Sequence, residues 1–145
     1  MTQQNSKPVA LITGASSGIG DTVARRFAEG GFDLVVVARR EERLAALAQS
    51  LEGTAQVAIY AGDVTDSETP KKAVELAMSR FGRLDCLVNN AGAGKWAPVH
   101  DTDDATLDEV IDISLKAPFR FCREALHVMK AGSTIINVGS VFGTL

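Results

Sequence analysis

Short apolar runs alternate along the chain with segments whose apolar residues recur every three or four positions. The runs are Val9 to Thr13, Leu34 to Ala38, Val57 to Ala61, a segment around Leu87 and Val88, and Thr134 to Val138. Runs that are short and apolar throughout are typical of strands buried on both faces of a parallel sheet. The segments between them have the spacing of amphipathic helices. The pattern therefore predicts strands that alternate with helices.

Four helices are predicted between these strands, each with a starting or ending signal. The first ends at Gly30-Gly31 and the second at Gly53, because glycine readily adopts the backbone conformation that closes a helix. Thr65 to Glu68 and Thr106 to Glu109 match the S/T-x-x-E pattern of a capping box, which predicts that the third and fourth helices start there. Five strands and four helices predict a single α/β domain over residues 1–145, with a doubly wound parallel sheet in a three-layer α/β/α arrangement.

Composition and charge exclude several classes of function. The apolar fraction of 46% and the charged fraction of 23% are those of a soluble globular protein, and a net charge of −3 favours neither nucleic-acid nor membrane binding. Met1 to Pro8 lacks the apolar core of a signal peptide, and the apolar context of Cys86 and Cys122 suggests buried thiols in a reducing compartment, so we expect a cytoplasmic protein. His100 and His127 have no ligand-like spacing, and no metal site is expected.

The residues Thr13 to Gly20, T-G-A-S-S-G-I-G, lie between the first predicted strand and the first predicted helix. Glycine lets the backbone turn sharply and approach a ligand closely. The helix that follows directs its unpaired N–H groups and its positive dipole end at the loop, which suits a pyrophosphate. A glycine turn without a ligand is the alternative, but the strand–turn–helix context favours binding. The predicted contacts are Gly14, Ser16, Ser17, Gly18, Ile19 and Gly20.

This loop, read together with N-N-A-G at Asn89 to Gly92, resembles the short-chain dehydrogenase/reductase (SDR) family. The likeness runs from Val9 to Gly143. It implies a Rossmann-type sheet with strand order 3-2-1-4-5, incomplete at the C-terminus, and hydride transfer between a nicotinamide and a carbonyl or alcohol substrate. It also implies cofactor contacts from Asn90, Ala91, Gly92, Ala93 and Ile113. Asn89 is expected to tie neighbouring strands through hydrogen bonds from its side chain to backbone.

The end of the second strand indicates which nicotinamide cofactor to expect. Arg39 stands where an NAD-binding fold usually has an acidic residue that holds the ribose 2′-hydroxyl. A guanidinium cannot accept that hydrogen bond but can clamp a 2′-phosphate, so Arg39 and Arg40 predict NADP(H). The alternative is that both arginines are solvated charges at a helix start. Asp63 and Val64 match the family position where a carboxylate accepts from the adenine amino group, although turn chemistry also explains Asp63.

Two serines are candidate catalytic residues. Ser140, at the end of the fifth strand, matches the family serine whose hydroxyl polarises the substrate oxygen, with an ordinary turn serine as the alternative. Ser114 replaces a family asparagine whose main-chain carbonyl holds a water of a proton relay. Because Pro118 has no N–H, the Ser114 carbonyl loses its α-helical partner. Either that carbonyl is free for the water or Pro118 merely kinks the helix.

The family's proton donor belongs to a Tyr-x-x-x-Lys segment, which we expect beyond position 145. Tyr60 lies in the third predicted strand and does not provide it. We therefore expect the chain alone to be inactive, because a positioned general acid is missing. A full-length form is expected to be a homodimer or tetramer, with the Asp108 to Met129 helix in the interface. The alternatives are a non-catalytic NADP(H)-binding module and an interaction domain whose glycine loop is vestigial.

Overall fold

Five strands build the sheet in a computed structural model that describes residues 6–94 and 97–141. They are β1 (Val9–Thr13), β2 (Asp33–Ala38), β3 (Val57–Ala61), β4 (Cys86–Asn89) and β5 (Thr134–Asn137). Every neighbouring pair is parallel, and the order across the sheet is β3-β2-β1-β4-β5. This confirms the predicted strand order.

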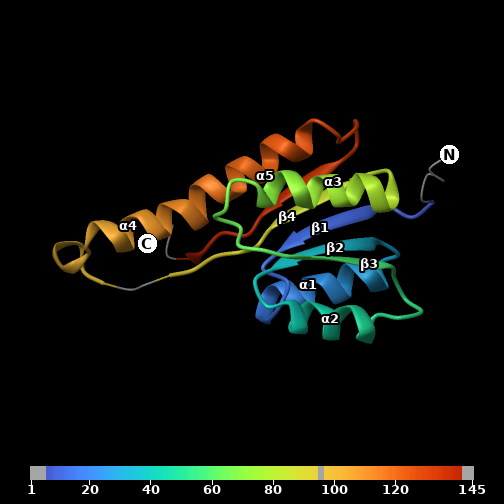
Figure 1. Ribbon diagram of the computed structural model, residues 1–145, viewed down its shortest axis with the longest axis horizontal. Helices are drawn as coiled ribbons and strands as arrows, with labels where there is room; N and C mark the ends of the chain where they lie inside the picture. Colours follow the sequence, from blue (N-terminus) through green and yellow to red (C-terminus); the bar gives the residue numbers. More distant parts are fainter. Residues whose placement is uncertain (1–5, 95–96, 142–145) are drawn as a thin grey trace.

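The helices cover both faces of this sheet. They are α1 (Gly18–Glu29), α2 (Glu41–Ser50), α3 (Thr69–Phe81), α4 (Asp104–Ile111) and α5 (Ala117–Leu126). A π-helical turn at Asp112–Lys116 joins α4 to α5, and a short 3-10 helix at Val99–Asp101 precedes α4. Figure 1 shows α1 and α2 on one face of the sheet and α3 and α5 on the other, with α4 extending beyond the strand ends. The three-layer arrangement is therefore confirmed.

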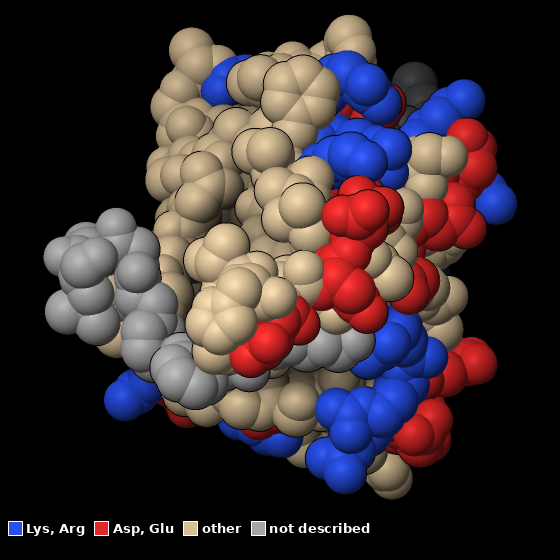
Figure 2. Space-filling view, turned by 90° about the vertical axis from the view of Figure 1, so that its left-hand side faces the viewer, with Lys and Arg blue, Asp and Glu red and all other residues tan. Residues whose placement is uncertain are grey.

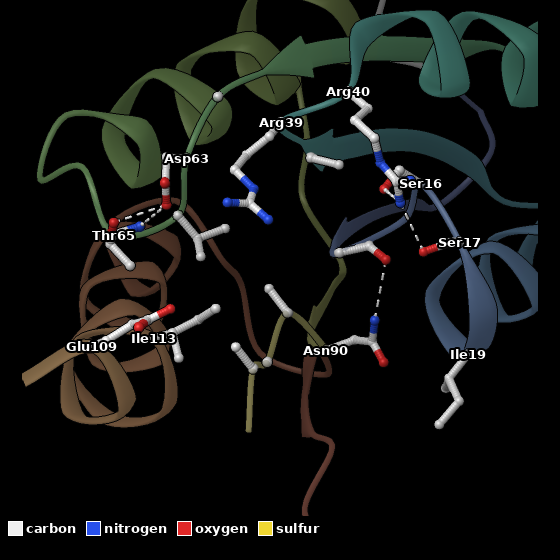
Figure 3. Close-up of a pocket in the computed structure, with 17 residues that line it drawn as sticks. Ser16, Ser17, Ile19, Arg39, Arg40, Asp63, Thr65, Asn90, Glu109 and Ile113 are labelled. Carbon is white, nitrogen blue, oxygen red and sulfur yellow. Dashed lines mark hydrogen bonds between the residues drawn. The ribbon is translucent and has the colours of Figure 1, made fainter. Parts of the chain in front are cut away.

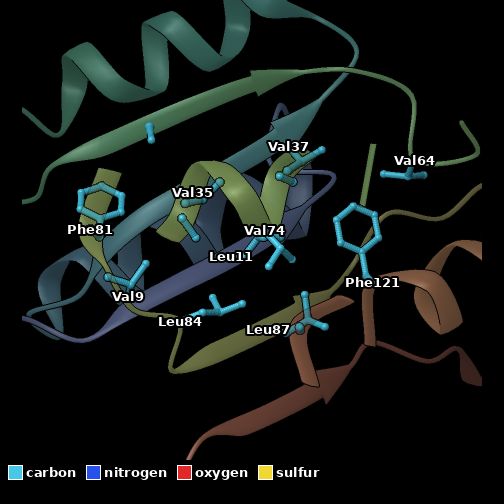
Figure 4. Packing of buried hydrophobic residues seen from close by; sticks show 14 of the residues in the cluster. Val9, Leu11, Val35, Val37, Val64, Val74, Phe81, Leu84, Leu87 and Phe121 are labelled. Atoms are coloured by element: carbon cyan, nitrogen blue, oxygen red, sulfur yellow. The ribbon is translucent and has the colours of Figure 1, made fainter. Parts of the chain in front are cut away.

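The central strands are buried at every position because each face of the sheet has its own core. Side chains alternate along a strand, so Val9 and Leu11 of β1 join the cluster under α3 and α5. Ala10 and Ile12 of the same strand join the cluster under α1 and α2. Figure 4 shows the first cluster, in which Val9 and Leu11 lie beneath α3. Burial on both faces explains why β1 and β2 lack a polar alternation.

Both predicted capping boxes are wrong, and the reason is the same. The hydroxyl of Thr65 donates to the Asp63 carboxylate at 2.8 Å, and α3 begins only at Thr69, followed by proline in its first turn. The cap of α4 is Asp103, whose Oδ1 accepts from the backbone N–H of Thr106 at 2.8 Å. Before α3, Oδ1 of Asp66 accepts from the Glu68 N–H at 2.9 Å, the hydrogen bond that the capping box assigned to Thr65. In α4, Asp103 caps the helix three residues earlier and leaves Thr106 inside it.

An ion pair anchors the amino-terminal ends of the central strands, opposite the end that carries the glycine loop. Asp85 accepts from the backbone N–H of Val9 at 2.8 Å and binds Arg83 through two hydrogen bonds of 2.8 Å each. Partial burial alone would raise the pKa of the Asp85 carboxyl. The hydrogen bonds from Arg83 and Val9, with the charges of Arg83 and Lys130, outweigh burial and lower the pKa. The ionised carboxylate therefore stabilises the entry of β1 into the sheet.

We expect Asp85→Asn to lower the free energy of unfolding at pH 7 by about 1–3 kcal/mol, since it weakens hydrogen bonds made by a charged group. A carboxyl whose pKa is depressed by folding adds stability above its unfolded pKa and loses it as pH falls through the folded pKa. The difference between wild type and variant should therefore shrink below about pH 4. Urea denaturation at pH 7 and pH 3 measures this. Glu29→Gln, which breaks the exposed pair with Arg26, is the control, and a difference independent of pH would contradict the assignment.

Candidate functional site

A cavity of about 460 Å³ lies at the carboxyl ends of the strands, where the order reverses between β1 and its neighbours β2 and β4. It brings together the predicted cofactor residues from four strand ends and from the helix that begins with α4 (Figure 3). The predicted residues that line it are Gly14, Ser16, Ser17, Ile19, Arg39, Arg40, Asp63, Val64, Asn90, Ala91, Gly92, Ala93 and Ile113. Gly18, Gly20, Ser114 and Ser140 do not line it.

Sequence reasoning missed four residues of the cavity wall, namely Ala38, Gly62, Thr65 and Glu109. Ala38 and Gly62 lie next to predicted residues at the ends of β2 and β3. They could have been found by including every residue at these two strand ends. Glu109 precedes Ile113 by four positions, a spacing that places both on one side of a helix. It could have been found once Ile113 was assigned.

The glycine loop is held in place by close backbone contacts. Gly14 has φ +68°, and its N–H donates to the Val37 carbonyl at 2.8 Å. A Cβ added at Gly20 would overlap the carbonyl of Gly14 and stand 2.6 Å from Nδ2 of Asn90. Gly18 has φ +58°, and a Cβ there would meet nothing within 4 Å. Gly14 and Gly20 therefore serve the packing of the loop, whereas Gly18 serves its backbone conformation, a positive φ that other residues rarely adopt.

Thr13 and Asn90 lock the loop to the end of β4. The buried Thr13 hydroxyl accepts from the backbone N–H groups of Asn90 and Ala91, both at 3.0 Å. The Asn90 side chain donates to the carbonyls of Thr13 at 3.1 Å and Gly14 at 3.4 Å. Figure 3 shows this side chain turned toward the loop. The Asn90 amide thus positions the loop, a role that the sequence did not reveal.

Asn89 ties β4 to β5, but through side chains rather than through the expected bonds from its side chain to backbone. Its Nδ2 donates to Oδ1 of Asn137 at 2.9 Å and to Sγ of Cys122 at 3.4 Å. The backbone continues the pairing, because the N–H of Val138 donates to the Asn89 carbonyl at 2.9 Å. These contacts fix the end of β5, from which Ser140 follows.

The cavity has a basic wall and an acidic wall. At the end of β2, Nη2 of Arg40 donates to the hydroxyls of Ser16 and Ser17 at 3.2 and 3.1 Å, and the Arg39 side chain points into the cavity (Figure 3). At the end of the neighbouring strand β3, beside Arg39, Oδ1 of Asp63 accepts from the N–H and hydroxyl of Thr65 at 2.9 and 2.8 Å (Figure 3). Figure 2 shows acidic side chains at this end of the molecule bordered above and below by basic ones.

The Asp63 carboxyl is held ionised. The backbone N–H of Thr65 lowers its pKa most, burial partly opposes this, and the Thr65 hydroxyl and the charge of Arg39 lower it further. A carboxylate in this state is a hydrogen-bond acceptor only. The cavity therefore offers basic groups for an anion at the end of β2 and an acceptor for an amine at the end of the neighbouring strand β3.

The two serines of the catalytic prediction lie outside the cavity. Ser114 is exposed and falls in the π-helical turn, where the N–H of Ala117 donates to the Asp112 carbonyl. The helix therefore widens before Pro118, a geometry that differs from the regular α-helix assumed for Ser114. Ser140 is exposed and follows β5 at the same edge of the sheet as the cavity. Gly143, at the end of the predicted segment, lies outside the described residues.

Neither a metal centre nor a membrane span emerges from residues 6–94 and 97–141. No group of three or more His, Cys, Asp or Glu side chains there could hold a metal ion. No helix in the same ranges is both long and apolar enough to cross a bilayer.

Comparison with known proteins identifies the family. The family model for short chain dehydrogenases matches residues 8–145, and the chain belongs to the short-chain dehydrogenase/reductase family of oxidoreductases. An A-factor type gamma-butyrolactone 1′-reductase from Streptomyces virginiae is 43% identical over 93% of this chain and 54% of its own length. A sulfoacetaldehyde reductase from Chromohalobacter salexigens is 38% identical over 93% of this chain and 55% of its own. The chain thus spans about half the length of these curated relatives.

Solved structures of the same family share the fold. An SDR from Brucella melitensis superposes with a TM-score of 0.92 at 33% identity, covering 99% of this chain and 61% of that one. L-sorbose reductase from Gluconobacter frateurii, solved with NADPH and L-sorbose, gives a TM-score of 0.89 at 36% identity, covering 97% of this chain and 55% of that one. The Rossmann-type sheet expected from the glycine loop is therefore confirmed.

Proposed function

We propose that the protein is an NADP(H)-dependent oxidoreductase that transfers hydride between the nicotinamide and a carbonyl or alcohol substrate. The observation that carries this proposal is the pair Arg39 and Arg40 at the end of β2, both on the cavity wall. No carboxylate stands at that strand end to accept from a ribose 2′-hydroxyl, whereas two guanidinium groups can bind a 2′-phosphate. The structural relative solved with NADPH and L-sorbose supports the same cofactor.

The residues present fit a dinucleotide. The N-terminus of α1 suits the pyrophosphate, and Ser16 and Ser17 on the cavity wall add hydroxyl donors. The ionised Asp63 suits the amino group of adenine. Asn90 and the residues that follow it continue along the cavity toward the end of β5, where the nicotinamide half would lie.

The chain's own catalytic contribution is assigned to Ser140. When bound, the nicotinamide supplies or accepts the hydride. The Ser140 hydroxyl would donate to the substrate oxygen and stabilise the charge that develops on it. The carbonyl of Ser114, in the π-helical turn, is proposed to hold a relay water, since π turns within helices are frequent at functional sites. Proton transfer itself is assigned to the Tyr and Lys of the family pattern in the full-length protein.

An apolar stripe supports the proposal of a homo-oligomer. Large apolar side chains are exposed along one side of α4, the π-helical turn and α5, namely Leu107, Ile111, Leu115, Phe119 and Leu126. A stripe of this size on a soluble protein commonly marks an interface. The proposed cytoplasmic location rests on the free thiols of Cys86 and Cys122.

The cofactor proposal is tested by binding. We expect NADPH to bind more tightly than NADH, and Arg39→Ala to weaken NADPH about 10–100-fold while leaving NADH nearly unchanged, because one hydrogen bond between charged groups is lost. Isothermal titration calorimetry with both cofactors measures this. Arg43→Ala is the matched control, because Arg43 is an exposed arginine of α2 outside the cavity wall. Equal losses for NADPH and NADH would contradict 2′-phosphate recognition by Arg39.

A further inference from the structure

Arg120, on α5, reaches across to the loop that joins β3 to α3. Its Nη1 donates to the Thr65 carbonyl at 3.2 Å in a partly buried contact. The side chain forms no ion pair with any residue in the described part of the chain. A guanidinium that is partly buried and directed at a backbone carbonyl, without a carboxylate partner, points to a role in holding that carbonyl in place.

The held loop is one side of the cavity. Gly62, Asp63, Val64 and Thr65 all line it. Most hydrogen bonds of the loop are local, such as those from Thr65 to Asp63, and the N–H of Gly62 attaches it to β2 by donating to the Ala38 carbonyl at 2.9 Å. None of these bonds sets its distance from the helix layer.

An apolar contact and a hydrogen bond join the loop to α5. Val64 is buried in the same apolar cluster as Phe121 of α5, and the two side chains lie next to each other in Figure 4. Arg120, the residue before Phe121, adds the polar contact to Thr65. The apolar contact resists separation but permits sliding, whereas a hydrogen bond is directional. The polar contact is therefore the one that fixes the orientation of the loop.

We propose that Arg120 is a positioning residue for the adenosine end of the nucleotide, acting through the Thr65 carbonyl to hold the Asp63 carboxylate in place on the cavity wall, beside Arg39. This inference rests on the proposed NADP(H)-binding function. Arg120 does not line the cavity, so its effect on the ligand is exerted through the loop. A ligand binds more tightly to a loop that is already ordered, because no binding free energy is spent on ordering the loop.

The test uses adenosine 2′,5′-bisphosphate, which carries the adenine and the 2′-phosphate but no nicotinamide. We expect Arg120→Met to weaken the binding of adenosine 2′,5′-bisphosphate about fivefold. This loss is smaller than the full contribution of a hydrogen bond from a charged group, because Arg120 acts through the loop. Arg120→Lys, which keeps a charged donor, should recover part of the affinity. Arg123→Met is the matched control, because Arg123 lies on the same helix, is exposed and pairs with Glu124. Calorimetry gives the dissociation constants, and thermal unfolding confirms that each variant is folded.

A double-mutant cycle with Asp63→Asn separates positioning from general support of the fold. If Arg120 acts through the loop, its substitution costs much less affinity in the Asp63→Asn background than in wild type, whereas Arg123→Met is neutral in both. Unchanged affinity in both Arg120 variants, or losses that simply add to that of Asp63→Asn, would overturn the inference while leaving the proposed function intact. A wild-type protein that binds neither adenosine 2′,5′-bisphosphate nor NADPH would overturn the proposed function itself.

Discussion

Gly20→Ala is expected to weaken NADPH binding by at least about 100-fold, the largest binding effect of any single methyl group in the cavity region. The added Cβ would overlap the carbonyl of Gly14 and stand 2.6 Å from Nδ2 of Asn90. Both neighbours are fixed, since Gly14 is bonded to β2 and the Asn90 amide is bonded to the loop. The methyl group therefore fits only if α1 moves away from the loop, which displaces the N–H groups proposed to bind pyrophosphate.

The control for this substitution lies at the other end of the same helix. Gly30→Ala places its Cβ 3.3 Å from the Arg26 carbonyl, a tight contact that a few tenths of an ångström relieves. We expect it to bind NADPH like the wild type. Calorimetry on both variants, with circular dichroism to confirm folding, makes the comparison. A folded Gly20→Ala protein with wild-type affinity would mean that the loop is not the phosphate site.

The order of the elements could be predicted from the sequence, but the starts of two helices could not. Strand positions follow from burial on both faces, which leaves an unmistakable apolar run such as Val9 to Thr13. A helix start depends on which of several nearby polar side chains bonds the first unpaired backbone N–H groups. Asp103 caps α4 three residues before Thr106, and Asp66 rather than Thr65 accepts from the Glu68 N–H before α3, and nothing in the spacing ranks such competitors.

The candidate site, like the fold, could be predicted only in part from the sequence. Residues at strand ends, such as Arg39 and Asp63, could be assigned because parallel strands bring their carboxyl ends to one edge. Contacts made across the sheet could not. Thr13 and Asn90 are bonded together from distant positions, and Arg120 meets Thr65 only because α5 packs beside the loop. The π-helical turn likewise has no sequence signal beyond the nearby Pro118, since it depends on how the helix packs.

Ser140→Ala is expected to lower kcat of the full-length protein about 100–1000-fold while leaving NADPH affinity unchanged. The serine follows β5, whose end is held against β4 by the Val138–Asn89 backbone bond and by the Asn89–Asn137 side-chain bond. That attachment would place the hydroxyl reproducibly beside a substrate oxygen. Ser140 lies outside the cavity lined by the nucleotide residues, so the proposed division of labour predicts loss of turnover without loss of binding.

Ser133→Ala is the control, because it removes the same hydroxyl at the opposite end of β5, where Ser133 donates to the Leu84 carbonyl at 3.5 Å. Steady-state reduction of a panel of aldehydes and ketones by the full-length protein gives kcat, and calorimetry gives the NADPH affinity. Wild-type turnover that survives Ser140→Ala would make Ser140 an ordinary turn serine. Saturable NADPH binding without turnover in the wild type, on substrates spanning small aldehydes to cyclic ketones, would instead favour a nucleotide-binding module. These two outcomes can be told apart. Turnover by Ser140→Ala would still show an enzyme, in which another residue polarises the substrate oxygen, whereas binding without turnover would not.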